Sequence, residues 1–330
     1  MADLIRLQAG GLVGPEQQFH IDARGKAEIN LITHAHGDHA RYGSDEYWCA
    51  ADCTPILHHR LGSGIRVRSM LYGEKVRCGD CWVSFHPAGH IRGSSQIRIE
   101  HGSDVWVVTG DYKRDPDPTC RPFESVPCRT LITEATFGLP IYHWMPTKTV
   151  VASIMDWWHL CKEEGTTAIL FCYALGKAQR ILAELRHWTD EDVLLHGAVA
   201  SLTSIYREQG IEMVPTRPVS DVKGNMAGHL VLAPPSAHRS PWMKRFPAVS
   251  TAFASGWMAV RGLRRRRGYH RGFVLSDHAD WKGLIKTIEE SEASRVLVTH
   301  GNSEVIARFL TEAKGLRAEP LKTEFAEEED

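Results

Sequence analysis

The sequence predicts an α/β protein in which an αββα core is interrupted by an inserted α/β domain. Three observations lead to this fold class. The first 140 residues are mainly short apolar strands separated by turn signals, whereas amphipathic helices alternate with strands from about Thr147. After residue 271 a final strand-helix alternation carries polar residues that belong chemically with the first part. We therefore expect a core of 1–140 and 272–330, an inserted domain at 141–271, and an acidic, frayed C-terminal tail.

The elements are predicted in order from hydrophobic periodicity and turn residues. In the first part, alternating apolar residues indicate the strands Ile29–Thr33, Trp82–His86, Gln96–Glu100, Val105–Thr109 and Thr130–Thr133. In the second part, helical spacing and apolar runs indicate Thr149–Glu164, Ala168–Cys172, Lys177–Arg186 and His229–Ala233. The last part indicates the strands Gly272–Leu275 and Arg295–Thr299 and the helices Trp281–Ser291 and Glu304–Ala313.

Composition is that of an ordinary globular protein, with 43% hydrophobic and 24% charged residues in 330. No stretch of 18 apolar residues occurs, and the N-terminus lacks the features of a signal peptide, so we expect a cytoplasmic protein without a membrane partner. The eight cysteines are too few for a disulfide scaffold. Cys49, Cys53, Cys78 and Cys81 have spacing compatible with a structural zinc site, but Cys78 and Cys81 flank a predicted hairpin turn, which favours packed thiols.

Positive charge is concentrated in one segment, although the formal net charge is only −1. Eight basic residues and no Asp or Glu lie between Ser240 and Gly272. Such a segment favours an anionic ligand, and the alternative is a solvated charge run. The run includes Arg264, Arg265, Arg266 and Arg267.

The densest cluster of metal-binding side chains is the H-x-H-x-D-H segment formed by His34, His36, Asp38 and His39. It directly follows an apolar strand. Residues two apart point the same way in an extended segment, so His34 and His36 can bind one metal ion, while Asp38 and His39 turn toward another. Imidazole nitrogen and carboxylate oxygen suit zinc, and also manganese or iron.

Further candidate ligands recur where strands end. His90, Asp111 and His300 each come just after a predicted strand. A single histidine at a strand end is usually a hydrogen-bonded structural residue, but together these residues complete a two-metal set.

These segments resemble the metallo-β-lactamase superfamily and, within it, the β-CASP nucleases. The resemblance covers nearly the whole chain. It depends on seven blocks that occur in order, namely Asp22, then His34, His36, Asp38 and His39, then His90, Asp111, Glu134, His278 and His300.

The resemblance implies two divalent metal ions, zinc or manganese, whose activated hydroxide attacks the scissile phosphate. It implies that His34, His36 and His90 hold the first ion, that Asp38, His39 and His300 hold the second, that Asp111 bridges both, and that Asp22 supports the histidine-rich loop. Asp38 would also share in accepting a proton. His278, paired with Glu134, would protonate the leaving group, the alternative being a structural Glu–His hydrogen bond.

Nucleic-acid contacts are also implied, because Phe171–Arg180 resembles the phosphate-facing start of a helix in β-CASP domains. Lys177, Arg180, Arg264, Arg265, Arg266 and Arg267 are the predicted contacts, lining a cleft between the two lobes. Two positions depart from the family pattern. We expect Arg92 to contact phosphate and Asp277 to tune His278.

The implied function is that of a DNA exonuclease in DNA repair, because Gly138–Pro140, Ser240–Met243 and Ser276–Trp281 resemble bacterial ligase-associated DNA exonucleases. We therefore expect nucleic acid as the partner, DNA rather than RNA, and a functional association with a DNA ligase and a helicase. The first alternative is an RNA-processing exo- or endoribonuclease, since His300 stands where eukaryotic DNA-repair members often carry an apolar residue. The others are a small-molecule metallo-hydrolase and an inactive scaffold.

Overall fold

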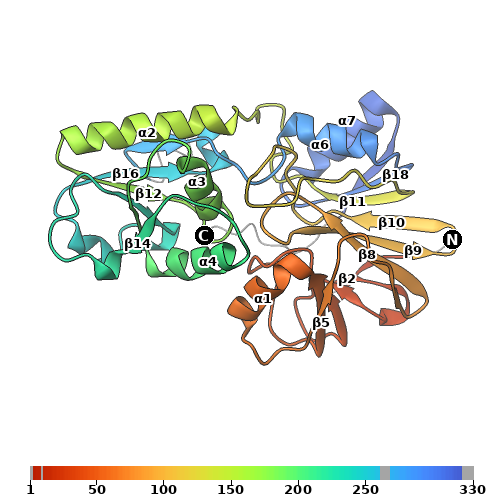
Figure 1. Cartoon of the computed structure of the whole chain (residues 1–330). Helices are drawn as coiled ribbons and strands as arrows, with labels where there is room; N and C mark the ends of the chain where they lie inside the picture. The colour runs from red at the N-terminus through yellow and green to blue at the C-terminus, as the bar shows by residue number, and fades with distance from the viewer. Residues whose placement is uncertain (1–2, 9, 261–267, 322–330) are drawn as a thin grey trace. The chain divides into compact units, whose positions relative to one another are not determined.

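The structure is a computed structural model that describes residues 3–8, 10–260 and 268–321. The chain forms two compact units (Figure 1). One contains the chain up to His143 together with the chain from His278 onward, and the other is Trp144–Asp277. The mixed α/β composition expected from the sequence is confirmed.

The first unit contains two sheets. The first sheet has the order β1-β2-β3-β4-β5-β6, with bounds Arg6–Gln8, Gly11–Val13, His20–Ile21, Ile29–Leu31, Glu46–Ala50 and Val67–Met70. The second has the order β19-β18-β11-β10-β9-β8-β7. Its strands, in that order, are Arg317–Pro320, Arg295–Thr299, Thr130–Glu134, Asp104–Val108, Ser95–His101, Cys81–Pro87 and Val76–Cys78. The helices of this unit are α1 (Thr54–Leu61), α6 (Trp281–Glu290) and α7 (Ser303–Lys314).

The two faces of the second sheet are buried against different layers. Along β10, Trp106 and Val108 pack in a cluster with residues of the first sheet, whereas Val107 packs with Leu284 of α6 and Leu310 of α7. Successive side chains of a strand point to opposite faces, so one apolar strand serves both layers. In Figure 1, α6 and α7 accordingly lie on the side of this sheet away from β2 and β5.

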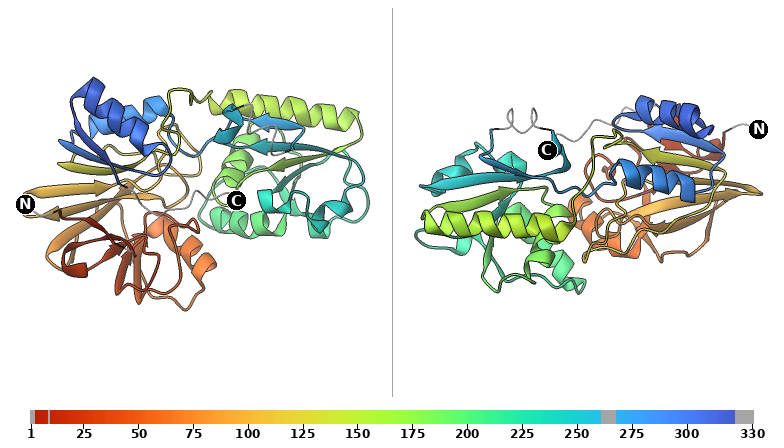
Figure 2. Two further views of the ribbon diagram at one scale, coloured as in Figure 1. Left: turned by 180° about the vertical axis from the view of Figure 1, so that it is seen from behind. Right: turned by 90° about the horizontal axis from the view of Figure 1, so that it is seen from above.

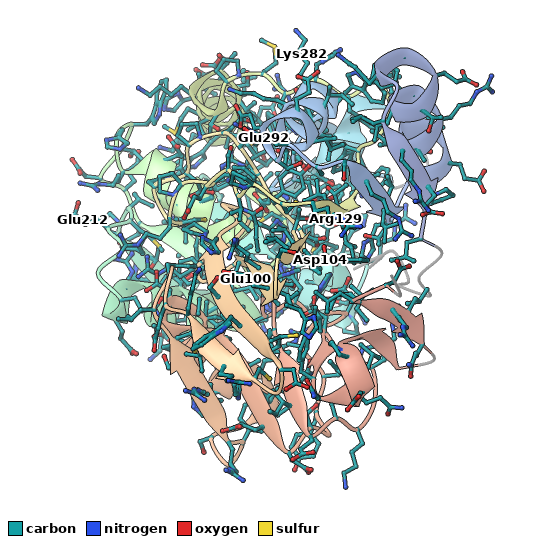
Figure 3. The ribbon with its side chains drawn as sticks, turned by 90° about the vertical axis from the view of Figure 1, so that its right-hand side faces the viewer. Glu100, Asp104, Arg129, Glu212, Lys282 and Glu292 are labelled. Carbon is teal, nitrogen blue, oxygen red and sulfur yellow. The ribbon has the colours of Figure 1, made fainter. Side chains whose placement is uncertain are left out.

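Strand direction brings the polar segments of the first unit to one edge. β8 and β10 are both antiparallel to β9, and β10, β11 and β18 are mutually parallel, so these four strands end at the same edge of the sheet. The loops that follow them carry candidate ligands. The starts of the strands carry ordinary ion pairs instead, such as Arg129 with Asp104 at 3.4 Å (Figure 3).

The second unit is built on a third sheet, ordered β14-β13-β15-β12-β16-β17, in which every pair of neighbours is parallel. Its strands, in that order, are Thr216–Pro218, Val193–Leu195, Leu230–Ala233, Thr167–Phe171, Val249–Ala254 and Arg271–Phe273. Among the described residues of this unit, the α-helices are α2 (Thr147–Glu163), α3 (Lys177–Leu185) and α4 (Gly197–Glu208). All five residues of β12 are buried, as expected for a parallel strand covered on both faces. The long helix α2 contacts β12 and β17 and runs alongside this sheet in the views of Figure 2.

One strand lies in a different unit from the one the sequence indicated. Gly272–Leu275 was expected to begin the final core segment, but β17 pairs in parallel with β16, with Ala252 opposite Arg271. The strand therefore belongs to the third sheet, and the chain leaves the second unit only after Asp277. The place of β17 in the third sheet depends on its pairing with β16. An isolated apolar run in the sequence does not show which strand it pairs with.

Two further expectations can be compared with the structure. Cys78 and Cys81 face each other across the β7–β8 hairpin, and no potential metal-ligand group among the described residues includes a cysteine. Within the described parts of the chain, no helix is both long and apolar enough to span a membrane.

Short 3-10 helices connect the larger elements. They are Pro15–Gln17, Ala51–Cys53, Val219–Asp221, Pro235–Ala237, Pro241–Arg245 and Gly256–Ala259.

Candidate metal centre

The histidine-rich loop follows β4 of the first sheet and turns within a few residues. The backbone N–H groups of His39 and Ala40 both donate to the carbonyl of His36, which closes a tight turn. His34 and His36 precede this turn, and Asp38 and His39 lie within it. His34 is grouped both with His36 and with Asp38 and His39, so the division of these side chains between two ions stays a prediction.

One group of potential ligand atoms combines this loop with the ends of two strands of the second sheet. Ligand atoms of His34, His36, His90 and Asp111 all lie within 4.8 Å of one another. The ring centroids of His34 and His90 are 4.8 Å apart, and those of His36 and His90 are 5.0 Å apart. His34 Nε2 is buried, has no hydrogen-bond partner among the described residues, and lies 3.5 Å from Asp111 Oδ2.

A second group shares His34 with the first. It contains His34, Asp38 and His39, with His39 Nε2 at 3.4 Å from Asp38 Oδ2 and 3.6 Å from Asp111 Oδ2. The ring of His300 stacks near that of His39, with centroids 5.8 Å apart. Among the described residues, His300 belongs to none of the groups whose ligand atoms lie within 4.8 Å of one another.

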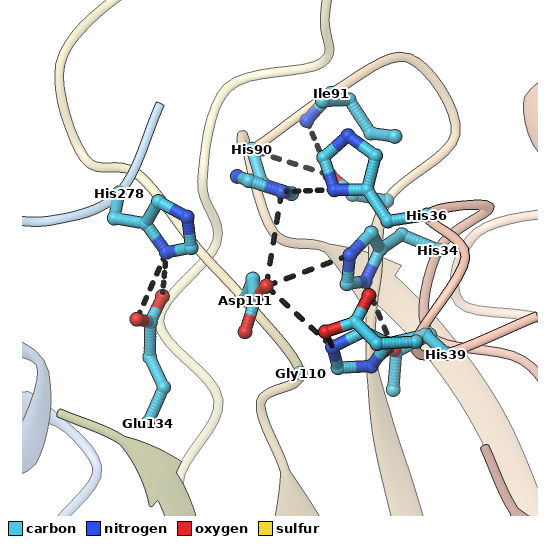
Figure 4. A network of polar contacts seen from close by, with 12 residues as sticks. His34, His36, His39, His90, Ile91, Gly110, Asp111, Glu134 and His278 are labelled. Carbon is cyan, nitrogen blue, oxygen red and sulfur yellow. Dashed lines mark hydrogen bonds and ion pairs between the residues drawn. The ribbon is translucent and has the colours of Figure 1, made fainter. Parts of the chain in front are cut away.

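These donors fit divalent metal ions. Imidazoles and carboxylates whose ligand atoms converge within 4.8 Å can each approach a common centre at the roughly 2.0–2.2 Å typical of zinc. The buried, unsatisfied Nε2 of His34 supports the same interpretation, because a buried polar atom normally has a partner. Figure 4 shows His34, His36, His39 and His90 on one side of Asp111, with His278 and Glu134 on the other.

Backbone conformation brings His300 to the site. His300 and Gly301 both have positive φ, at 56° and 54°. A Cβ atom on residue 301 would lie 2.3 Å from the carbonyl oxygen of Ala135, so only glycine fits there without a shift. Thr299 Oγ1 lies 2.9 Å from His300 Nδ1, which leaves Nε2 on the other side of the ring.

Asp22 holds the loop from behind. Its carboxylate accepts hydrogen bonds from the Thr33 backbone N–H at 2.8 Å and from the Thr33 hydroxyl at 2.6 Å, and it lies 2.8 Å from His39 Nδ1. A carboxylate at Nδ1 selects the tautomer in which that nitrogen carries the proton, so Nε2 is directed to the metal centre.

Glu134 and His278 contact each other, and with Asp111 they form a third group whose ligand atoms lie within 4.8 Å of one another. His278 Nδ1 lies 2.9 Å from Glu134 Oε2, and the backbone N–H of Tyr112 donates to Glu134 Oε1 at 2.8 Å. The rings of His90 and His278 have centroids 4.6 Å apart. His278 remains 20% exposed while Glu134 is almost fully buried.

Comparison with known proteins finds no protein-family model that matches the chain. The Probable DNA ligase of Opitutus terrae is 33% identical over 310 residues, which cover 93% of this chain and 30% of that protein. The transcription termination factor FttA of Thermococcus kodakarensis is 27% identical over 58% of this chain and 36% of its own length. The RNase J-like protein of Methanocaldococcus jannaschii is 27% identical over 41% of this chain and 34% of its own length.

The chain thus spans no more than 36% of the length of any of these three relatives. The relatives of this chain include β-CASP nucleases of the metallo-β-lactamase superfamily, and the ordered motifs of the chain resemble theirs. A crystal structure of a protein of unknown function from Enterococcus faecalis V583 has a related fold, with a TM-score of 0.59 and 13% identity over 91% of this chain and 80% of that one.

Two of the predicted nucleic-acid contacts are buried, whereas residues that contact nucleic acid in a cleft would be exposed. Lys177 and Arg180 are 2% and 3% exposed, and both donate to the carboxylate of Asp277. A phosphate oxygen would have to displace Asp277 to reach either charge. Arg92 likewise donates to Asp52 Oδ1 at 3.2 Å.

The remaining predicted contacts are Arg264, Arg265, Arg266 and Arg267, which lie outside the described residues.

Several residues with neutral hydroxyl groups contact the candidate ligands and were not predicted from the sequence. Ser94 Oγ accepts from the backbone N–H groups of His90 and Ile91, at 3.0 and 3.2 Å. Thr33 Oγ1 lies 3.1 Å from His34 Nδ1, and Thr299 Oγ1 lies 2.9 Å from His300 Nδ1. Serine and threonine are common throughout the chain, so no signal in a single sequence distinguishes these three.

Burial and neighbouring charges shift the pKa values of the candidate metal-binding histidines in different directions. Burial keeps the pKa of His34 well below its ordinary value, and burial likewise lowers the pKa of His300 to about 4, with the neighbouring His39 adding to both effects. Both imidazoles are therefore neutral near pH 7, which is the form that binds metal. For His39, burial lowers the pKa, but Asp38, Asp111 and Asp22 outweigh it, and the pKa lies well above the ordinary value.

Metal binding should release protons. Near pH 7 His39 carries a proton that it must lose to become a ligand, and burial raises the pKa of Asp111 to about 7, so that below this pH Asp111 must lose one as well. Because protons compete with metal for both groups, affinity should fall as pH falls. Calorimetric titration with zinc or manganese in buffers of different ionisation enthalpy measures the release. We expect more protons released at about pH 6.5 than at about pH 8.5, and equal release at both would contradict these assignments.

Replacing Asp22 with Ala should weaken metal binding by about 10- to 100-fold, because His39 loses the acceptor that orients its ring. Isothermal titration calorimetry gives the affinity, and Asp45→Ala, which changes an exposed carboxylate, is the matched control. Unchanged affinity in a folded Asp22→Ala protein would mean that His39 does not depend on Asp22.

Proposed function

We propose that this protein is a two-metal-dependent phosphodiesterase that degrades DNA as an exonuclease. The observation that carries the proposal is the convergence of candidate ligands that follow β4 and β8 on Asp111, which follows β10, beside a Glu–His pair that can supply a proton. In this proposal, the two-sheet unit is the αββα metallo-β-lactamase core, and Trp144–Asp277 is the inserted β-CASP domain.

The ligand assignment follows the two groups of donors. His34, His36 and His90 would hold one ion, Asp38, His39 and His300 would hold the other, and Asp111 lies between them. When bound, such ions activate water for attack on phosphorus and neutralise charge on the phosphate. Zinc and manganese both suit this combination of nitrogen and oxygen donors.

Asp38 is suited to accept a proton from the attacking water. Burial would raise its pKa, but the neighbouring His39 outweighs this effect and holds the carboxylate ionised. Its side chain is 14% exposed, so it stands at the open side of the site rather than within the core.

His278 is suited to donate a proton to the leaving sugar oxygen. Glu134 lies at its Nδ1, so the proton to be transferred would be on Nε2. Burial raises the pKa of Glu134, but the charge and hydrogen bond of His278 outweigh burial, so that the pKa is lowered and Glu134 stays ionised. An ionised Glu134 stabilises the protonated imidazole that general-acid catalysis needs.

DNA is favoured as the substrate because the relative that aligns with 93% of this chain is named as a Probable DNA ligase. On the same basis we propose an association with DNA repair and a DNA ligase, and a helicase partner follows from the family resemblance. The second candidate is an RNA-processing nuclease, which the relative named as an RNase J-like protein favours.

The test is digestion of end-labelled DNA and RNA strands of the same sequence, with manganese or zinc, by the wild-type protein and by Asp38→Ala. We expect stepwise shortening of DNA that Asp38→Ala abolishes. Cleavage of RNA alone would favour the second candidate. Cleavage of neither strand by the folded, metal-loaded wild type would reject the nuclease proposal.

A further inference from the structure

Three charged side chains are buried together where the chain leaves the second unit. Lys177 Nζ donates to Asp277 Oδ2 at 2.8 Å, and Arg180 Nη1 donates to Asp277 Oδ1 at 3.2 Å. All three residues are at most 3% exposed. Burying charges costs free energy unless they are paired and hydrogen-bonded, so this arrangement requires a fixed geometry.

Arg180 also fixes the backbone on both sides of this network. Its Nη1 donates to the carbonyl of Ser276 at 2.7 Å, and its Nη2 donates to Thr147 Oγ1 at 2.6 Å. Thr147 begins α2, close to the point where the chain enters the second unit, and Ser276 lies close to the point where it leaves. One guanidinium group thus joins the two ends of the second unit.

The cations come from a rigid element. Both lie in the first turn of α3, whose start is fixed by Gln179: its Oε1 accepts from the backbone N–H of Gly176, and its Nε2 donates to the carbonyl of Ala174. A carboxylate held by this turn cannot shift without breaking two charged hydrogen bonds.

The residue that follows Asp277 is His278, and the chain after it is equally constrained. The backbone N–H of Ala279 donates to the carbonyl of Tyr112 at 2.7 Å, and Asp280 accepts from the backbone N–H of Gly283 at the start of α6. The Asp277 carboxylate and the Ser276 carbonyl are therefore restraints on the side that precedes His278, and Ala279 and Asp280 are restraints on the side that follows.

We propose that Lys177 and Arg180 are positioning residues, which hold Asp277 and thereby orient the His278 imidazole for proton transfer to the leaving oxygen. This inference rests on the proposed function, in which His278 is the general acid. It also gives the two cations a role that needs no contact with nucleic acid. Replacing a buried ion pair by apolar groups is often neutral for stability, so stability alone does not explain why charges occupy this place.

The first test compares substrates with different leaving groups. A sugar alkoxide needs a proton as it leaves, whereas p-nitrophenolate does not. For Asp277→Ala we expect kcat on end-labelled DNA to fall about tenfold, a part of the about 10²- to 10⁴-fold that a general acid contributes. KM for DNA and the hydrolysis of bis(p-nitrophenyl) phosphate should stay close to wild type. Asp277→Asn keeps one acceptor oxygen, which can hold only one of the two cations, so it should recover only part of the loss.

Gln179→Met is the matched control. It disturbs the same helix start without touching Asp277, so it should lower the melting temperature without changing the ratio of the two activities. Equal loss on both substrates in Asp277→Ala would mean a general structural role and would overturn the inference.

The second test needs neither metal nor substrate. In long-range ¹H–¹⁵N spectra of the metal-free protein, with the His278 signals assigned by their absence in His278→Gln, we expect the ring resonances to shift in Asp277→Ala and to stay unchanged in Gln179→Met. Unshifted resonances in Asp277→Ala would overturn the inference.

The outcomes separate the two proposals. If the wild type cuts no nucleic acid, the proposed function fails, and the spectra still decide whether Asp277 orients His278. If Lys177→Met raises KM for DNA and leaves kcat unchanged, the cations bind phosphate instead and the positioning role is wrong. If His278→Gln loses activity but Asp277→Ala retains it, only the further inference fails.

Discussion

Replacing Asp111 with Asn should lower metal-dependent cleavage by at least about three orders of magnitude, which corresponds to about 4 kcal/mol of transition-state stabilisation. Asp111 is the carboxylate that both donor groups approach: its Oδ2 lies 3.5 Å from His34 Nε2 and 3.6 Å from His39 Nε2. The amide keeps the shape of the side chain but removes its negative charge and one ligand oxygen. Both metal ions should therefore bind more weakly.

The measurement is the initial rate of end-labelled strand cleavage together with the metal content of the dialysed protein. Asp115→Asn is the matched control, because it makes the same change four residues away on an exposed side chain. A folded Asp111→Asn protein that retained both its metal and its activity would show that Asp111 does not join the two donor groups.

Replacing His278 with Ala should lower kcat on DNA by about 10²- to 10⁴-fold without loss of bound metal, because it removes a proton donor and no assigned ligand. Glu134→Gln should produce a smaller loss, since the imidazole remains but loses its ionised partner at 2.9 Å. Because the two residues act as one unit, the double variant should be about as slow as His278→Ala alone.

Single-turnover rates with excess protein give the chemical step for each variant, and His101→Ala removes an exposed histidine of the same unit as a control. Losses that simply multiply in the double variant would show that the Glu134–His278 contact has no catalytic coupling. Loss of metal in His278→Ala would instead make this residue a ligand, in line with the grouping of Asp111, Glu134 and His278.

Much of the candidate site could be predicted because its residues lie at strand ends, where sequence and geometry are simply related. His90 and Asp111 come after strands that end at one edge, so an apolar run followed by a polar residue made them candidates, whereas Glu134 was implied only by the family resemblance. The spacing within the histidine-rich loop predicted the division between two ions. Neither argument required knowledge of long-range contacts.

The remainder depends on contacts that the sequence does not encode locally. The first sheet consists largely of strands of two to five residues, such as His20–Ile21, which are too short for a periodic pattern. Helix α4 is rich in β-branched and small residues and gave no clear helical pattern. The burial of Lys177 and Arg180 was not predictable, because their partner Asp277 is about 100 residues away in the chain.

The order in which the ligands occur along the chain has a consequence for protein synthesis. His34 emerges from the ribosome early, but His278 and His300 emerge only after the whole of Trp144–Asp277 has been made. A nascent chain therefore has His34, His36, Asp38 and His39 long before it has His278 or His300. Under the proposed function, the set of residues assigned to hydrolysis is complete only after translation has passed His300.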